Sequence, residues 1–230
     1  MDAAMNDWLL LRDYVDNKSE AAFEALVKRH VDMVYATALR QVRDPHLAQD
    51  ISQAVFLLLA RKAARLRSSV ILGGWLYRTA NFVASRALRA RVRQYQNEKE
   101  ALSMLSEPST DELWETLAPY LDHAMNELGA TERNAVVLRY LQQRNFREVG
   151  EALGVSEDAA KKRVGRALEK LRSKLARRTV NITGITLATI LTAKTAQAAP
   201  AAVVAGAIKA GLQAGALAAP TAMLTAPVLA

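Results

Sequence analysis

The sequence predicts an all-α protein: two small helical domains joined by a flexible linker, the second with a helix-turn-helix, and a low-complexity C-terminal tail. Apolar residues recur at the helical period over long stretches, and no convincing strand pattern occurs before residue 179. Residues 95–111 become acidic, polar and proline-bearing, which is typical of a linker. Residues 179–230 are almost wholly small or aliphatic, without one acid. We therefore expect domains over residues 1–94 and 112–178, with the linker between them and the tail after them.

The first domain is predicted to contain helices over residues 20–43 and 46–65. Asp44-Pro45 separates them, because the residue before a proline avoids the α region. On the second helix, Asp50, Gln53 and Leu57 line up on the side opposite the apolar stripe. An exposed leucine beside an acid and an amide is ordinary on a protein surface, but it also suits a docking ridge for another protein. The pattern alone leaves both interpretations open.

A loop over residues 66–74, ended by paired glycines, precedes a third helix that begins at Trp75. This helix also carries a row of polar donors: Arg78, Asn81, Arg86 and Arg89. An aromatic ring that stacks an unpaired base, with arginines along the phosphates, is the usual chemistry of single-stranded nucleic-acid binding. A core tryptophan followed by a solvated arginine face would give the same pattern, so both interpretations stay open.

The second domain is predicted to begin with a helix over residues 112–128, which Gly129 ends, and a further helix capped by Thr131 and running to Leu141. Residues 145–178 then have the pattern of a helix-turn-helix. Asn145 and Glu148 can form a capping box, and Gly154 supplies the positive φ that a tight turn needs. Ser156 is the predicted N-cap of the second helix, and nine basic residues between Lys161 and Arg178 face one acid. That density suits phosphate contacts in a major groove.

The composition favours a polyanionic partner and gives no sign of an active site. The 230 residues carry a net charge of +8, and no cysteine is present for a disulfide or a thiolate metal site. His30, His46 and His123 stand apart, without companion ligands at metal spacing. Phosphate-binding glycine loops, nucleophile elbows and zinc signatures do not occur. We expect a protein that is not an enzyme, that needs no cofactor or metal and that works in the cytoplasm, since its N-terminus lacks a secretory pattern.

Two blocks of the sequence resemble the extracytoplasmic-function (ECF) class of bacterial RNA polymerase sigma factors. AFEALVKRHVDMVYATALRQVRDPHLAQDISQAVFLLLARK and WLYRTANFVASRALRARVRQ resemble region 2 of that family. LGATERNAVVLRYLQQRNFREVGEALGVSEDAAKKRVGRALEKLRSKL resembles region 4. With the linker, the resemblance covers about residues 18–177. It implies a non-catalytic, dissociable subunit that recruits core RNA polymerase, through its β′ and β subunits, to promoters.

The resemblance also implies roles for the residues above. The family's D-x-x-Q matches Asp50 and Gln53, with Leu57 beside them, and would bind the clamp of the β′ subunit. The loop 66–74 and the helix from Trp75 would engage the −10 element and the melted non-template strand, with these candidates: Trp75, Arg78, Asn81, Arg86 and Arg89. The second helix of the helix-turn-helix would read the −35 element in double-stranded promoter DNA, with these candidates: Ser156, Glu157, Asp158, Lys161, Lys162, Arg163 and Arg166.

The sequence departs from the family at three places. Relatives often carry asparagine and aspartate where this chain has Phe82 and Arg86, so the −10 specificity is not implied. Gly165 within the recognition helix costs about 1 kcal/mol relative to alanine; it either permits close approach to DNA or is a tolerated weak spot. The tail lies outside the resemblance. It could contact a membrane weakly, form a weakly ordered or partly helical appendage, or pack on the two domains and regulate them.

The sequence thus predicts an RNA polymerase sigma factor, with an anti-sigma factor as a conceivable further partner. A stand-alone helix-turn-helix transcriptional regulator is the first alternative, and a membrane-attached signalling adaptor is the second. A plain regulator has no reason to carry the polar ridge on residues 46–65 together with Trp75 and its arginines.

Overall fold

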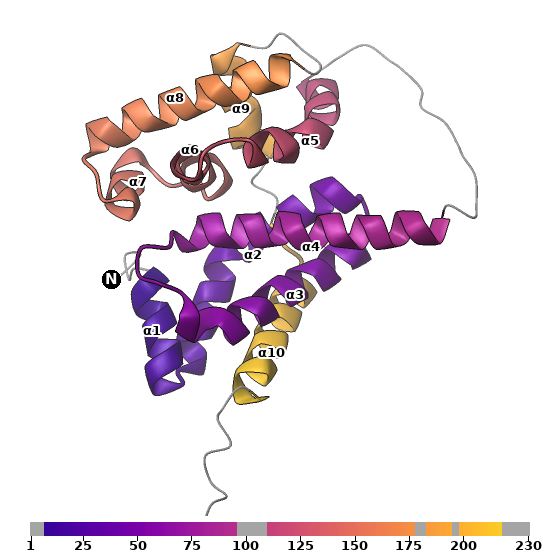
Figure 1. The fold of residues 1–230 in the computed structure, drawn as a ribbon, viewed down its shortest axis with the longest axis vertical. Helices are drawn as coiled ribbons and strands as arrows, with labels where there is room; N and C mark the ends of the chain where they lie inside the picture. Colours follow the sequence, from indigo (N-terminus) through magenta and orange to yellow (C-terminus); the bar gives the residue numbers. More distant parts are fainter. Residues whose placement is uncertain (1–6, 96–109, 178–182, 195–197, 218–230) are drawn as a thin grey trace, which may run out of the picture.

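The computed structural model describes residues 7–95, 110–177, 183–194 and 198–217, and these residues form helices and turns without a strand (Figure 1). They make two packed groups of helices. The first group contains α1–α4 together with α10, and the second contains α5–α9. The prediction of an all-α fold is confirmed. The predicted linker falls mostly on residues 96–109, which lie outside the described residues.

The first group consists of α1 (Asp7–Asn17), α2 (Glu20–Val42), α3 (Pro45–Lys62), the 3₁₀ turn η1 (Ala63–Arg65) and α4 (Leu72–Tyr95). Side chains cap its helices as the local sequence requires. The Ser19 hydroxyl accepts a hydrogen bond from the Ala22 N–H at the start of α2. Asp44 accepts from the N–H groups of His46 and Leu47, so it starts α3 immediately after it interrupts α2.

The start of α4 differs from the prediction. The helix begins at Leu72, so Gly73 and Gly74 lie in its first turn and not in the preceding loop. Both glycines are buried, and a side chain on either would collide with Gln142 or Asn134 of the second group. Close packing between the groups therefore outweighs the low helix propensity of glycine.

The second group consists of α5 (Thr110–Asn126), α6 (Ala130–Val136), the π-helical turn η2 (Val137–Leu141), α7 (Phe146–Leu153), α8 (Glu157–Ala176) and α9 (Gly184–Lys194). The predicted cap at Thr131 is wrong, because α6 already begins at Ala130 with Gly129 as its N-cap. The Gly129 N–H donates to the Glu132 carboxylate at 3.2 Å, and the Gly129 carbonyl accepts from the Arg133 N–H at 2.9 Å. Helix α6 therefore starts without a hydroxyl cap, and the Glu132 side chain binds the backbone of its N-cap residue.

Two clusters of charged side chains join the groups. Asp122 of α5 accepts hydrogen bonds from Arg40 of α2 at 3.0 Å and from the Tyr77 hydroxyl of α4 at 2.7 Å, and all of these groups are largely buried. At the other junction, Asp7 of α1 pairs with Arg29 at 2.7 Å in its own group and with Arg144 at 3.2 Å from the second. The relative position of the groups thus rests on charged hydrogen bonds as well as on apolar packing.

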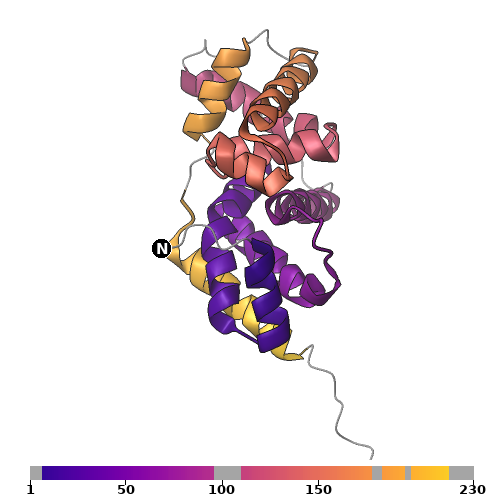
Figure 2. The same cartoon turned by 90° about the vertical axis from the view of Figure 1, so that its left-hand side faces the viewer.

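The described part of the tail packs on both groups. Helix α9 contacts α5, η2 and α8, and buries Leu187, Ile190 and Leu191. Helix α10 (Ala201–Leu217) lies against α2 and α3 of the first group (Figures 1 and 2). Among the three interpretations of the tail, packing on the domains is the one that these residues adopt. None of the described helices combines the length and the apolar character that a membrane crossing needs.

Candidate docking and nucleic-acid surfaces

The helix-turn-helix forms with the local chemistry that the sequence predicts. The Glu148 N–H donates to the Asn145 side chain at 2.9 Å, and the Asn145 N–H donates to the Glu148 carboxylate at 2.8 Å, which completes the capping box. Gly154 takes φ 65°, in the left-handed region that favours glycine. Gly150 lets α7 approach the turn, because a Cβ there would lie 2.7 Å from the Val155 carbonyl oxygen. These features fix the angle between α7 and α8.

Helix α8 separates a buried stripe from an outer face. Ala160, Val164, Ala167, Leu171 and Leu175 are buried against the second group. Ser156 caps the helix by accepting from the Ala159 N–H at 3.3 Å. The outer face begins with exposed residues, as predicted for a helix that enters a groove: Glu157, Asp158, Lys161, Lys162 and Arg166, with Arg163 half-buried.

Several cations of α8 already have acidic partners. Lys161 lies 2.9 Å from Glu157, and this contact holds the pKa of the lysine above its ordinary value. Farther along the helix, three more pairs occur: Lys170 with Glu132, Arg172 with Glu169, and Lys174 with Glu127. In the described part of the chain, Lys162 and Arg163 form no ion pair. The cationic surface available for phosphates is therefore smaller than the count of basic residues suggests, and it centres on the first half of α8.

The ridge on α3 is only partly open. Asp50 is exposed, whereas Gln53 and Leu57 are half-buried, and Leu57 packs against the core. Helix α10 lies over Gln53: a Cβ on Gly206 would stand 2.5 Å from the amide nitrogen of Gln53. The structure thus brings the three predicted residues to one side of α3, but a segment of the same chain covers part of it.

The residues of α4 that are predicted to contact DNA differ in their exposure. Trp75 is half-buried against the core, while Arg78, Arg86 and Arg89 are exposed. Asn81 is 4% exposed; its amide donates to the Tyr77 carbonyl at 3.0 Å and its oxygen accepts from Gln41. The expectation that Asn81 faces a nucleic acid is therefore corrected for this arrangement, because its side chain holds α4 to α2.

Comparison with known proteins decides which family has this pair of domains. Residues 26–94 match the family model of sigma-70 region 2, and residues 124–173 match that of sigma-70 region 4. The RNA polymerase sigma factor CarQ of Myxococcus xanthus is 33% identical over 159 residues, which are 68% of this chain and 91% of the relative. The chain belongs to the RNA polymerase sigma factors.

Relatives whose names identify them as ECF sigma factors place this sigma factor in the ECF class. The ECF sigma factor SigW of Bacillus subtilis is 24% identical over 70% of this chain and 92% of the relative. Among solved structures, the sigma factor RpoE of Bartonella quintana, crystallised with the anti-sigma factor NepR, is 20% identical with a TM-score of 0.33, covering 73% of this chain and 99% of that chain. Sigma factors are regulatory proteins that bind core RNA polymerase and promoter DNA.

The structure exposes an aromatic residue, Phe82, that the sequence marked only as a departure from the family pattern. Phe82 of α4 is 57% exposed, and the Arg86 guanidinium lies 5.7 Å from the centre of its ring. The sequence indicates this surface aromatic by one sign: Phe82 is an apolar residue outside the buried stripe, four positions before an arginine. In this sigma factor Phe82 offers a flat surface on the same helix as the predicted single-strand contacts.

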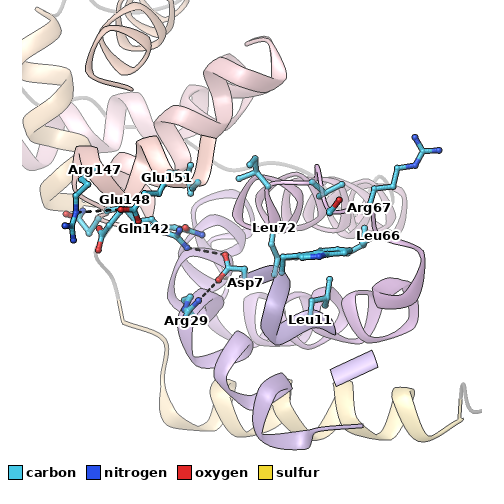
Figure 3. A pocket seen from close by; sticks show the side chains of 18 residues that line it. Asp7, Leu11, Arg29, Leu66, Arg67, Leu72, Gln142, Arg147, Glu148 and Glu151 are labelled. Atoms are coloured by element: carbon cyan, nitrogen blue, oxygen red, sulfur yellow. Dashed lines mark hydrogen bonds and ion pairs between the residues drawn. The ribbon is translucent and has the colours of Figure 1, made fainter. Parts of the chain in front are cut away.

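The loop predicted to engage the −10 element faces the second group across a cavity of about 730 Å³ (Figure 3). Residues 66–68 and 70–72 line one side, and Arg147, Glu148 and Glu151 of α7 line the other. The charges at its edge are largely paired, since Arg147 lies 3.8 Å from Glu151 and Arg29 binds Asp7. The loop thus borders the helix-turn-helix domain in this arrangement of the sigma factor.

Proposed function

We propose that this sigma factor joins core RNA polymerase through the face of α3 that carries Asp50, Gln53 and Leu57, and holds two promoter elements with α4 and α8. It works as a dissociable, non-catalytic subunit in the cytoplasm. The observation that carries the proposal is the exposed first half of α8, set by the capping box and Gly154, in a chain that also has the region 2 ridge.

The outer face of α8 supplies the contacts with the −35 element. Lys162 and Arg166 are exposed one turn apart, so both can reach the same groove or its phosphates. Glu157 and Asp158 stand at the N-terminal end, where recognition helices contact base edges and where carboxylates can accept from cytosine amino groups. The first turn therefore reads bases, and the basic residues behind it position the helix.

The −10 element is proposed to meet α4. Trp75 and the exposed Phe82 provide aromatic surfaces, and Arg78, Arg86 and Arg89 provide cations along the same helix. Aromatic stacking together with arginines accommodates unpaired bases of any sequence. An anti-sigma factor, a contact with the β subunit and a weak membrane contact of residues 179–230 stay predictions of the sequence.

A reconstituted transcription assay tests the proposal. Purified full-length protein is mixed with bacterial core polymerase and a pool of promoter fragments, and initiated transcripts are sequenced. We expect start sites that share an upstream motif. DNA binding by the protein alone, without polymerase association or transcripts, would favour the stand-alone regulator instead.

The docking residues are tested by Asp50→Ala. Asp50 is exposed, so the variant should keep its fold while its affinity for core polymerase falls about tenfold or more, because a charged contact is removed. Asp16→Ala is the matched control: it removes an exposed acid from α1 that pairs only with Arg12 among the described residues. Equal affinities of the two variants for core would contradict the proposed docking face.

A further inference from the structure

The C-terminal helix α10 occupies the face that the proposed function assigns to polymerase. We propose that α10 is a built-in occupant of the α2–α3 face, and that core polymerase must displace it to dock. This proposal rests on the proposed function, because it assigns a competitor to the same surface. The α2–α3 face fits a helix with small residues on one side, and α10 is such a helix.

The contact between α10 and the first group is closely fitted. Three glycines of α10 each stand over a side chain: Gly206 over Gln53, Gly211 over Phe23 and Gly215 over Tyr14. A Cβ at any of these positions would collide with the residue beneath it. Between them, Val203, Ala207 and Ala214 are buried. Glycine at all three places allows the backbone of α10 to approach α2 and α3 closely. A nonspecific contact by an apolar tail would not require glycine at these positions.

Two hydrogen bonds tie the tail to the body of the protein before α10 begins. Before α10, the Ala199 N–H donates to Asp32 of α2 at 2.8 Å. Earlier in the tail, the Gln143 side chain donates to the Thr192 carbonyl of α9 at 3.2 Å. Helix α10 is therefore delivered to its face as an intramolecular ligand, which gives it a high effective concentration there.

The covered area includes the polymerase ridge. The contact of α10 with α3 is the most extensive between any two described helices. Gln53 lies under α10 and is half-buried, so α10 restricts the access of a polymerase segment to this side chain. Asp50 remains exposed, which leaves a first contact for an approaching polymerase.

The composition of α10 makes displacement feasible. Each of its three glycines lowers the stability of an isolated helix by about 1 kcal/mol relative to alanine, so α10 depends on its docking site for its structure. Its outer side carries only small or solvated residues, for example Ala202, Ala205 and Gln213. A partner that binds the α2–α3 face more tightly can therefore release α10, which then also loses its contacts with Phe23 and Tyr14.

The test compares two full-length variants, Gly211→Val and Ala205→Val. The first places a side chain against the ring of Phe23, which is fully buried, and should dislodge α10. The second adds the same side chain on the exposed face of the same helix. Binding to core polymerase is measured by titration. If α10 covers the ridge in about nine-tenths of the molecules, Gly211→Val should bind roughly tenfold more tightly than the native chain, and Ala205→Val should bind as the native chain does.

A second variant and a peptide keep the test decisive if Gly211→Val does not fold. Val203→Glu puts a charge into the buried contact of α10 and should also tighten core binding. A synthetic peptide of residues 198–217, added to either variant, should weaken core binding again.

The outcomes separate the two proposals. If the native chain and both variants bind core equally well while Asp50→Ala weakens binding, α10 is not a competitor and the docking face stands. If none of the chains binds core polymerase, the proposed function itself fails, and this inference fails with it.

Discussion

Asp122 shows how single residues control the arrangement of the two helical groups. Burial alone would lower the pKa of Arg40, but the adjacent Asp122 carboxylate outweighs it and raises that pKa. Burial and the same carboxylate hold the pKa of Tyr77 well above its ordinary value. Arg40 therefore stays charged and the Tyr77 hydroxyl stays protonated, and both donate to Asp122 across the junction. The sequence contained no local sign of this cluster, because Asp122 is 82 positions from Arg40 and 45 from Tyr77.

Asp122→Ala should loosen the junction. The substitution leaves the Arg40 guanidinium buried without its partner, which disfavours the packed arrangement of the two helical groups by roughly 3–5 kcal/mol. The two groups should therefore separate, so that water can hydrate the guanidinium. Small-angle X-ray scattering would detect a larger radius of gyration. Lys170→Ala, which removes a surface ion pair within the second group, should leave the radius unchanged. An unaltered radius for Asp122→Ala would show that apolar packing and the Asp7–Arg144 pair hold the groups without Asp122.

Asp7 predicts how stability responds to acid. Burial works to raise its pKa, but His30, Arg144 and Arg29 together outweigh burial and hold the pKa far below its ordinary value. A carboxyl with a lowered folded-state pKa contributes stability that is present above about pH 4 and is lost as the pH falls further. The native chain should therefore be more stable than Asp7→Asn at pH 7, with a difference that shrinks below pH 4. Urea midpoints at pH 7, 5 and 3 measure this, and a constant difference would refute the assignment.

At the scale of helices, the sequence predicted best where local chemistry decides. The starts of α7 and α8 follow from Asn145 and Ser156, whose side chains bond to backbone groups a few residues away. Prediction failed at the starts of α4 and α6. Gly73 and Gly74 are helical because they pack beneath side chains that are distant in the sequence. Helix α6 begins one residue before Thr131, with Gly129 as its N-cap and the Glu132 carboxylate bound to the Gly129 N–H. The contacts of Gly73 and Gly74 join residues far apart in the chain, and such contacts leave no periodic trace in a sequence.

Two glycines of the helix-turn-helix should respond oppositely to alanine. Gly150→Ala forces a Cβ against the backbone at Val155, which cannot move freely, so it should destabilise the chain by about 1–3 kcal/mol. A Cβ on Gly165 would meet no neighbouring atom within 4 Å, so Gly165→Ala should stabilise the chain by about 1 kcal/mol. Chemical denaturation compares both. Promoter binding by Gly165→Ala then tests the sequence's two interpretations: unchanged affinity identifies a weak spot, and lost affinity identifies close approach to DNA.

At the scale of the whole molecule, the three predicted surfaces differ in access. The outer face of α8 is open, the ridge on α3 lies partly under α10, and the start of α4 lies beneath the second group. The sequence identified Asp50 and the α8 residues as surface groups because helical periodicity separates inner from outer positions. It could not show the burial of Asn81 or the cover over Gln53, since both depend on how helices far apart in the chain come together.

The two short helices of the tail also limit how far the two helical groups can move apart. Lys194, at the end of α9, is four residues from Ala198, which precedes α10, and four extended residues span at most roughly 14 Å. The connection from Tyr95 to Thr110 is fifteen residues long and can extend to roughly 50 Å. While α9 and α10 both stay docked, the segment between them is therefore a shorter connection between the two helical groups than the segment from Tyr95 to Thr110. Any DNA or polymerase geometry that draws those groups farther apart must first release one of the two tail helices.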